Sequence, residues 1–172
     1  MQKRVIWLFG LSSAGKSTIS QQLIKHFNNN HRPVVLLDGD EVRNSVNKDL
    51  GFSDNDRMEN IRRSAEFARL LIGQNVSVIA AFITPRKSMR ELVKQILGDD
   101  VLMVYINTPL EECIKRDVKG LYKKAAGNEI KDFTGIQSVF ETPENENVIT
   151  ISTTNKTPEE CANEILKIEY FN

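Results

Sequence analysis

The chain has 172 residues, which is enough for one domain whose hydrophobic core needs no disulfide bonds. Apolar residues make up 40% of the chain and charged residues 27%, a composition that argues against fibrous and disordered proteins. Lys plus Arg and Asp plus Glu both total 23, and this zero net charge argues against a nucleic-acid-binding protein. No apolar run approaches the roughly 20 residues that span a bilayer, and the two cysteines, Cys113 and Cys161, lie far apart. We therefore expect residues 1–172 to form a single cytoplasmic domain without membrane or nucleic-acid partners.

Five short runs rich in Val, Ile and Leu are expected to be strands that are covered on both faces. They are residues 5–9, 34–37, 76–83, 102–106 and 148–151. Helical spacing of apolar residues separates some of them, most clearly at residues 16–28 and 55–73. Two later helices are expected to begin at capping boxes, at Thr108 and Thr157, each with Pro at the first helical position. This order of elements predicts an α/β fold with a central parallel sheet of about five strands.

Residues 115–146 show neither a helical nor a strand period. Their first part is basic and contains Arg116, Lys119, Lys123 and Lys124. A helix with a solvated basic face is one interpretation. We favour a mobile lid over residues 115–137, whose cations would close over bound phosphates.

A phosphate-binding motif joins the first predicted strand to the first predicted helix. Residues 10–17 read GLSSAGKS and fit the pattern G-x-x-x-x-G-K-[ST]. Backbone N–H groups of such a loop converge on phosphate oxygens, and the following helix N-terminus adds further donors. Lys16 supplies a positive charge, and the Ser17 hydroxyl can bind Mg²⁺ that arrives with the nucleotide. The motif predicts a three-layer sandwich of the P-loop NTPase type that binds a nucleoside triphosphate with Mg²⁺.

Charged and aromatic residues that follow the second predicted strand form a candidate acceptor site. Asp38 and Asp40 stand at its carboxyl end, where parallel sheets bind ligands. Arg57 and Asn60 are three residues apart on one predicted helix, and together with Arg43 they could hold an anion. Two aromatic residues among polar neighbours, Phe52 and Phe133, could stack on a base.

The sequence resembles the adenylylsulfate kinase family over nearly its whole length. The motifs that carry the resemblance are residues 10–18, 37–43, 47–54, 59–63, 80–83, 119–125 and 133–136. The resemblance implies an ATP- and Mg²⁺-dependent kinase that phosphorylates the 3′-hydroxyl of adenosine 5′-phosphosulfate in sulfate activation. We also expect a homodimer.

The resemblance further implies roles for individual residues. We assign catalysis to Lys16, Asp38 and Lys123, with Ser17 and Asp38 near Mg²⁺, the latter through water. The expected ATP-binding residues are Gly10, Ser13, Ala14, Gly15, Lys16, Ser17, Thr18 and Arg116. The expected acceptor-binding residues are Asp40, Arg43, Phe52, Arg57, Asn60, Ile83, Thr84, Lys119 and Phe133.

Three departures from the family pattern lie beside the acceptor site and the lid. They are Thr84 where many members have Ser, Arg86-Lys87 after Pro85, and Gln137-Ser138 with Phe140-Glu141 in the lid region. We interpret Thr84 as a substrate contact, because in-line transfer needs only positioning and charge stabilisation. A changed acceptor pocket leaves one alternative, a kinase for another activated nucleotide such as cytidine 5′-diphosphoramidate in capsule synthesis. The second alternative is a P-loop module that binds nucleotide without transferring phosphate. A GTP switch of this kind would normally carry an Asn/Thr-Lys-x-Asp guanine-binding run, and the sequence has none.

Overall fold

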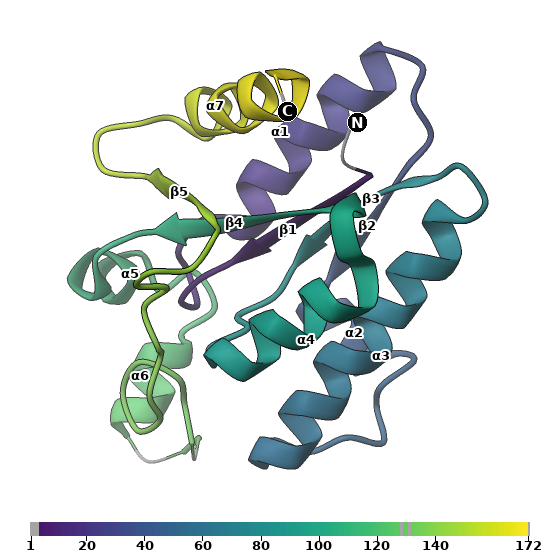
Figure 1. Cartoon of the computed structure of the whole chain (residues 1–172). Coiled ribbons are helices and arrows are strands. Elements are labelled where there is room, and N and C mark those ends of the chain that lie inside the picture. Colours follow the sequence, from purple (N-terminus) through teal and green to yellow (C-terminus); the bar gives the residue numbers. More distant parts are fainter. Residues whose placement is uncertain (1–3, 128, 131, 172) are drawn as a thin grey trace.

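The computed structural model describes residues 4–127, 129–130 and 132–171, and its centre is a parallel sheet (Figure 1). Its strands are β1 (Val5–Phe9), β2 (Val34–Asp38), β3 (Ser77–Ala81), β4 (Val101–Asn107) and β5 (Ile149–Ser152). They lie in the order β2-β3-β1-β4-β5, and every pairing is parallel. The predicted α/β class and five-stranded parallel sheet are confirmed.

Helices cover both faces of this sheet, as the three-layer prediction requires (Figure 1). On one face lie α1 (Lys16–Asn29) and α7 (Pro158–Phe171). On the other lie α2 (Gly39–Asn44), α3 (Asp54–Ile72) and α4 (Lys87–Leu97). The shorter α5 (Leu110–Arg116) and α6 (Leu121–Ala126) stand beyond the carboxyl end of β4, and a 3-10 turn, Gly98–Asp100, precedes that strand.

The central strand β1 explains why the strand runs lack polar alternation. Its side chains point alternately to the two faces, and both faces are buried under helices. Leu8 packs with Leu23 of α1 in one core cluster, whereas Trp7 packs with Val93 of α4 in the other. Every residue of β1 is therefore apolar.

The two predicted capping boxes have different outcomes. Thr157 is confirmed as a cap, because its Oγ1 accepts from Glu160 N at 3.2 Å while Glu160 Oε2 accepts from Thr157 N at 2.7 Å. The prediction for Thr108 is wrong: α5 begins at Leu110, and its N-cap is Pro109 without a side-chain cap bond. The hydroxyl of Thr108 is buried and bonds elsewhere, as described below.

Other differences from the sequence prediction concern short elements near the carboxyl edge of the sheet. The helices α2 and α4 were not predicted, and α6 lies inside the segment 115–146 that shows no clear period. Strand β3 ends at Ala81, two residues earlier than expected. None of the helices in the described ranges is both long and apolar enough to cross a membrane.

Candidate active site

A cleft of about 620 Å³ opens at the carboxyl ends of the strands. It is lined by residues from the β1–α1 loop, the β2–α2 junction, α3, the end of β3 and the segment 116–134. The expected site residues in its lining are Ser13, Ala14, Gly15, Lys16, Ser17, Thr18, Asp38, Asp40, Arg43, Phe52, Arg57, Asn60, Ile83, Thr84, Arg116, Lys119 and Phe133. The structure thus brings both groups of expected residues, those for ATP and those for the acceptor, to one cleft.

Two expected site residues, Gly10 and Lys123, are not in this lining. Gly10 has φ +146°, and a Cβ there would lie 2.6 Å from the carbonyl oxygen of Ile106, so glycine is required for packing against β4. Lys123 has an exposed side chain on α6, whose buried face carries Tyr122 and Ala125. Lys123 is therefore exposed outside the cleft lining, and its catalytic role stays a prediction.

The phosphate loop surrounds the side chain of Lys16, the first residue of α1. Gly15 caps α1 with φ +104°, a left-handed conformation that glycine adopts without strain. The Lys16 ammonium donates to the carbonyl oxygens of Gly10 at 3.0 Å and Leu11 at 2.6 Å. Burial lowers the pKa of Lys16 to about 8, although the carboxylates of Asp38 and Asp40 oppose that shift. The loop therefore places a partly desolvated cation beside the helix N-terminus, which is an anion-binding arrangement.

Two distant side chains fasten this loop. The Thr108 hydroxyl donates to Ala14 O at 2.8 Å and also bonds the Thr153 hydroxyl at 2.7 Å. The Tyr122 hydroxyl donates to Ser12 O at 3.0 Å from α6. Sequence reasoning missed both functions, because Thr108 matches a capping pattern and Tyr122 is one aromatic residue in a segment without a period.

Asp38 joins the phosphate loop to the acceptor side of the cleft. Its Oδ2 accepts from the Ser17 hydroxyl at 2.7 Å, and its Oδ1 accepts from Asp40 N at 3.0 Å, which caps α2. Within the described part of the chain, no three His, Cys, Asp or Glu side chains form a metal-binding group. Ser17 and Asp38 nevertheless present two hard oxygen atoms, which suits Mg²⁺ because that ion relies mainly on substrate phosphates and water.

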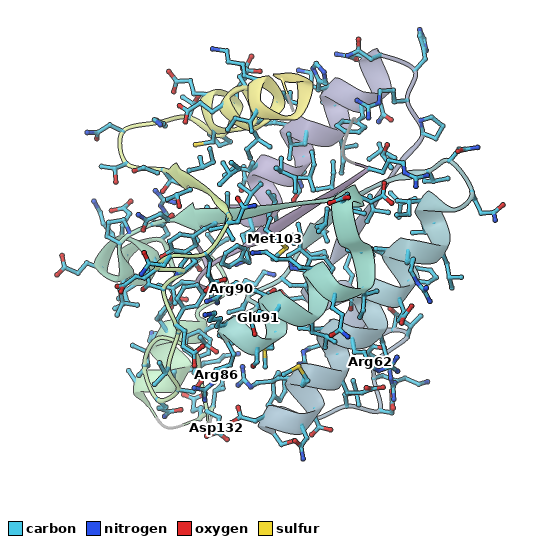
Figure 2. All side chains as sticks on the ribbon, viewed as in Figure 1. Arg62, Arg86, Arg90, Glu91, Met103 and Asp132 are labelled. Atoms are coloured by element: carbon cyan, nitrogen blue, oxygen red, sulfur yellow. The ribbon has the colours of Figure 1, made fainter. Side chains whose placement is uncertain are left out.

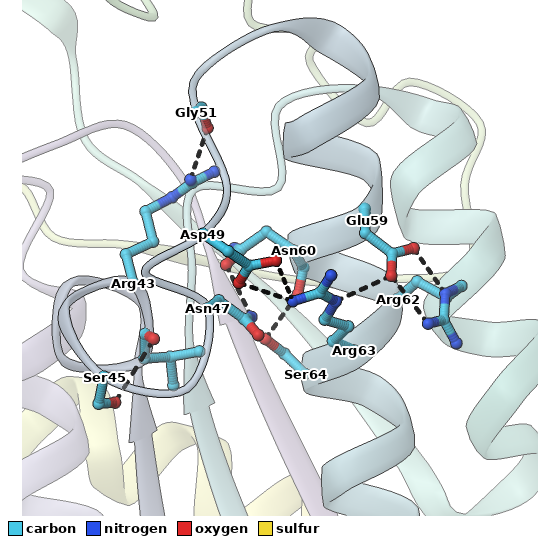
Figure 3. Close-up of polar contacts among 11 residues, drawn as sticks. Arg43, Ser45, Asn47, Asp49, Gly51, Glu59, Asn60, Arg62, Arg63 and Ser64 are labelled. Carbon is cyan, nitrogen blue, oxygen red and sulfur yellow. Dashed lines mark hydrogen bonds and ion pairs between the residues drawn. The ribbon is translucent and has the colours of Figure 1, made fainter.

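The acceptor side combines two arginines with an exposed aromatic ring. The guanidinium groups of Arg43 and Arg57 lie 4.8 and 5.8 Å from the centroid of Phe52, which is 62% exposed. Arg43 donates to Gly51 O at 2.8 Å (Figure 3). Burial lowers the pKa of both arginines, yet each keeps its charge because the ordinary value is so high. This wall of the cleft is cationic.

Asn60 stands buried on α3 at the base of that wall, with its amide held in place. Its Oδ1 accepts from Asn47 Nδ2 at 3.0 Å, and its backbone carbonyl accepts from the Ser64 hydroxyl at 2.7 Å (Figure 3). With the oxygen engaged, the amide NH₂ is the group that Asn60 can offer to a ligand. A donor of this kind suits an anionic acceptor.

The segment expected to be a lid contacts the cleft at several places. Lys119 forms an ion pair with Asp40, and this bond raises the pKa of Lys119. Arg57 donates to Asp132 O at 2.6 Å and to the Thr134 hydroxyl at 3.1 Å. Phe133 is buried and meets Tyr122 edge to face at 4.9 Å, so it lies deeper than Phe52. Residues 128 and 131 of this segment lie outside the described residues.

Thr84 forms the remaining corner of the cleft and has an unusual backbone. It is buried, and its φ of +42° is rare for a β-branched residue. Trp7 Nε1 donates to its hydroxyl at 3.0 Å, and Arg90 Nη1 donates to its carbonyl at 3.2 Å. The sequence carries no sign of these two contacts, because Trp7 belongs to a strand run and Arg90 to an ordinary amphipathic stretch.

Comparisons with known proteins identify the family. The family model described as adenylylsulphate kinase matches residues 2–151. The adenylyl-sulfate kinase of Clostridium kluyveri is 47% identical over 162 residues, which are 94% of this chain and 81% of that protein. The adenylyl-sulfate kinase of Staphylococcus epidermidis is 47% identical over 164 residues, 95% of this chain and 82% of that protein. The APS kinase CysC of Mycobacterium tuberculosis, solved in complex with AMPPNP and APS, is 35% identical with a TM-score of 0.92 and covers 97% of both chains. The chain therefore belongs to the adenylylsulphate kinase family.

Proposed function

We propose that this protein transfers the γ-phosphoryl group of ATP to the 3′-hydroxyl of adenosine 5′-phosphosulfate, with Mg²⁺ as cofactor. The observation that carries the proposal is the single cleft of about 620 Å³ in which the phosphate loop faces a cationic wall. Relatives named adenylyl-sulfate kinase, 47% identical over most of the chain, support the same reaction. The products are ADP and 3′-phosphoadenosine 5′-phosphosulfate.

The geometry supports a division of labour among the residues of the cleft. The loop from Ser13 to Thr18 binds the ATP phosphates, assisted by Arg116, whose Nη1 lies 3.5 Å from Ala14 O. Ser17 and Asp38 would hold Mg²⁺, the latter through water, and the bound ion would neutralise charge on the phosphates. Lys16 neutralises the migrating phosphoryl group, and transfer then depends on positioning and electrostatics rather than on a covalent intermediate.

Asp38 orients the attacking 3′-hydroxyl and receives its proton as the new P–O bond forms. The bond between the γ-phosphorus and the bridging oxygen breaks, and the electron pair leaves with ADP. The residues expected to bind the acceptor hold the nucleotide in this proposal: Asp40, Arg43, Phe52, Arg57, Asn60, Ile83, Thr84, Lys119 and Phe133. In this proposal the anionic 5′ group lies against Arg43, Arg57 and Asn60, because these are the donors of the cationic wall.

Residues 1–172 act in this proposal as one kinase domain with a lid at 115–137. We further propose a homodimer in the cytoplasm. A hexameric APS kinase from Thiobacillus denitrificans, 28% identical with a TM-score of 0.69, is an assembled relative, although this chain spans only 29% of it. Cys113 and Cys161 are free and buried, which agrees with a reducing compartment. Light scattering tests the dimer by comparing the solution mass with twice the chain mass of 19.5 kDa.

An acceptor panel at saturating ATP and Mg²⁺ tests the reaction. We expect ADP release to depend on adenosine 5′-phosphosulfate and to be far slower with AMP or cytidine 5′-diphosphoramidate. A preference for the cytidine compound would replace the proposed substrate. ADP release that no nucleotide acceptor stimulates would instead indicate a P-loop protein without kinase activity.

A further inference from the structure

An ion pair with little solvent exposure lies behind the acceptor side of the cleft. Arg90 lies on α4 (Figure 2). It donates from Nε to Glu146 Oε2 at 2.9 Å and from Nη2 to Oε1 at 2.6 Å. The two side chains are 0% and 5% exposed, and the guanidinium lies 5.2 Å from the centroid of Phe9. The hydrogen bonds from Arg90 lower the pKa of Glu146. Buried ion pairs are seldom more stabilising than apolar side chains of similar size, so stability alone is a weak reason for this one.

The third donor group of Arg90 binds Thr84, a residue of the cleft lining. Its Nη1 bonds the carbonyl oxygen of Thr84, whose φ of +42° stores backbone strain. A strained conformation persists only where its surroundings hold it, and Thr84 is held on two sides. Trp7 donates a hydrogen bond to its hydroxyl at 3.0 Å, and Arg90 donates one to its carbonyl oxygen at 3.2 Å.

Glu146 connects this corner to the chain that leaves the lid. It lies between the lid and β5, in the same segment as Glu141. Glu141 Oε2 accepts from Lys87 N at 2.6 Å, and Glu141 N donates to Pro85 O at 2.8 Å. Glu141 therefore bonds the backbone at Pro85, the residue after Thr84, and at Lys87, the first residue of α4.

We propose that Arg90, anchored by Glu146, is a positioning residue for the acceptor. It keeps Thr84 in its left-handed conformation, and so sets the position of the Thr84 hydroxyl and the Ile83 backbone in the cleft. Loss of this geometry weakens acceptor binding far more than ATP binding. Gly10 N donates to Ile83 O at 3.2 Å, but the phosphate loop is also held at Ser12 by Tyr122 and at Ala14 by Thr108. The inference rests on the proposed function for the identity of the acceptor, but not for the geometry at Thr84.

The chain contains a matched control for this arginine. Arg4 donates from Nε and Nη2 to Asp100 at 2.9 and 3.1 Å and from Nη1 to Ile72 O at 2.8 Å. These are the same three kinds of contact, but they lie just before β1, at the opposite edge of the sheet from the cleft. Arg4→Lys therefore removes a fork with the same contacts, although a more exposed one, without touching the acceptor side.

The first experiment needs no substrate. Trp7 is the only tryptophan of the chain, so its indole N–H gives a single NMR signal that reports on the Thr84 hydroxyl. Lysine cannot hold both Glu146 oxygens and the Thr84 carbonyl, so Arg90→Lys should shift this signal and speed its hydrogen exchange about tenfold or more. Thr84→Val gives the reference for a lost bond. Arg4→Lys should leave the signal unchanged, and an unchanged signal in Arg90→Lys would overturn the proposal.

The second experiment measures steady-state kinetics on the same variants. We expect Arg90→Lys to raise the acceptor KM about tenfold, with the ATP KM within about twofold of wild type. Arg4→Lys should change neither KM. Equal changes in both KM values, or an unchanged acceptor KM, would overturn the proposal.

A paired variant guards against loss of folding. Arg90→Met combined with Glu146→Met removes both buried charges at similar volume, and such replacements are tolerated by other proteins. It should reproduce both the indole change and the rise in acceptor KM. If the wild-type protein does not phosphorylate adenosine 5′-phosphosulfate, the proposed function fails. The measurement on the Trp7 indole signal still decides whether Arg90 positions Thr84.

Discussion

The Ser17 hydroxyl donates a 2.7 Å hydrogen bond to Oδ2 of Asp38. This bond joins the first turn of α1 to the carboxyl end of β2. Helix α1 follows β1, and β3 lies between β1 and β2 in the sheet. It brings Ser17, which is expected to lie near the nucleotide phosphates, into contact with Asp38, which is expected to orient the acceptor. The reacting groups of both substrates can therefore meet within hydrogen-bonding distance of one carboxylate.

Asp38→Asn should lower kcat about 10²- to 10⁴-fold, the range for removal of a general base. The melting temperature should change little, because Asn caps a helix as well as Asp and can still accept from Ser17. Initial rates with each substrate and thermal melts check this. Asp49→Asn is the control, since that exposed carboxylate pairs with Arg63 and is not in the cleft lining (Figure 3). A kcat within tenfold of wild type would remove Asp38 from the reaction.

Lys16 should make ATP capture sensitive to pH above neutrality. Its pKa of about 8 means that the free enzyme loses this charge as pH rises through that value. We expect kcat/KM for ATP to fall above about pH 8, because this ratio reports ionisations of the free enzyme. In Lys16→Arg, whose guanidinium stays charged, any residual activity should lack that inflection.

The same shift has a defined sign for stability. Between pH 8 and 10.5 the unfolded chain holds a proton on Lys16 that the folded chain has lost. The free energy of unfolding therefore increases as the pH rises through this range. Relative to Lys16→Met, wild type should therefore become more stable across this range. A constant difference in melting temperature between the two proteins would contradict the lowered pKa.

Arg43→Ala should raise the acceptor KM by about 10- to 150-fold, which corresponds to the loss of about 1.5 to 3 kcal/mol from a charge-assisted bond. The KM for ATP should change far less, because Arg43 lies on the cationic wall beside Phe52. Steady-state kinetics with each substrate varied in turn measure the split. Arg63→Ala is a suitable control, since Arg63 pairs with Asp49 and Glu59 outside the cleft lining (Figure 3). Equal effects on both KM values would place Arg43 away from the acceptor.

The lid prediction concerns hydrogen exchange in residues 115–137. Protection from exchange should rise when ADP and acceptor are bound together, because bound phosphates attract the basic segment and hold it closed over the cleft. Lys119 and Tyr122 already bond this segment to the cleft. Mass spectrometry of exchanged peptides gives the comparison with the free protein. Protection of residues 10–18 without any change in 115–137 would show that the segment is not a lid.

Several features of this protein could be predicted from the sequence because they depend on neighbouring residues. The phosphate loop is contiguous, and Gly10 and Gly15 supply the backbone conformations that it needs. The strands follow from short apolar runs, and the cap at Thr157 follows from a pattern of four residues. The family resemblance rests on such contiguous motifs.

The tertiary structure alone decided which polar side chains meet across the chain. Arg90 finds Glu146 at a separation of 56 residues, and Lys119 finds Asp40 at 79. Thr108 matches a capping pattern, yet its hydroxyl fastens the phosphate loop, 94 residues away, at Ala14. The physical reason is that a helix cap or turn depends on the backbone geometry of neighbouring residues. The partner of a buried donor depends instead on which distant segments the crossover connections of the parallel sheet bring to the same edge. On the proposed acceptor side, Arg57 likewise bonds Asp132 and Thr134 at separations of 75 and 77 residues, and no local pattern in the sequence reveals these partners.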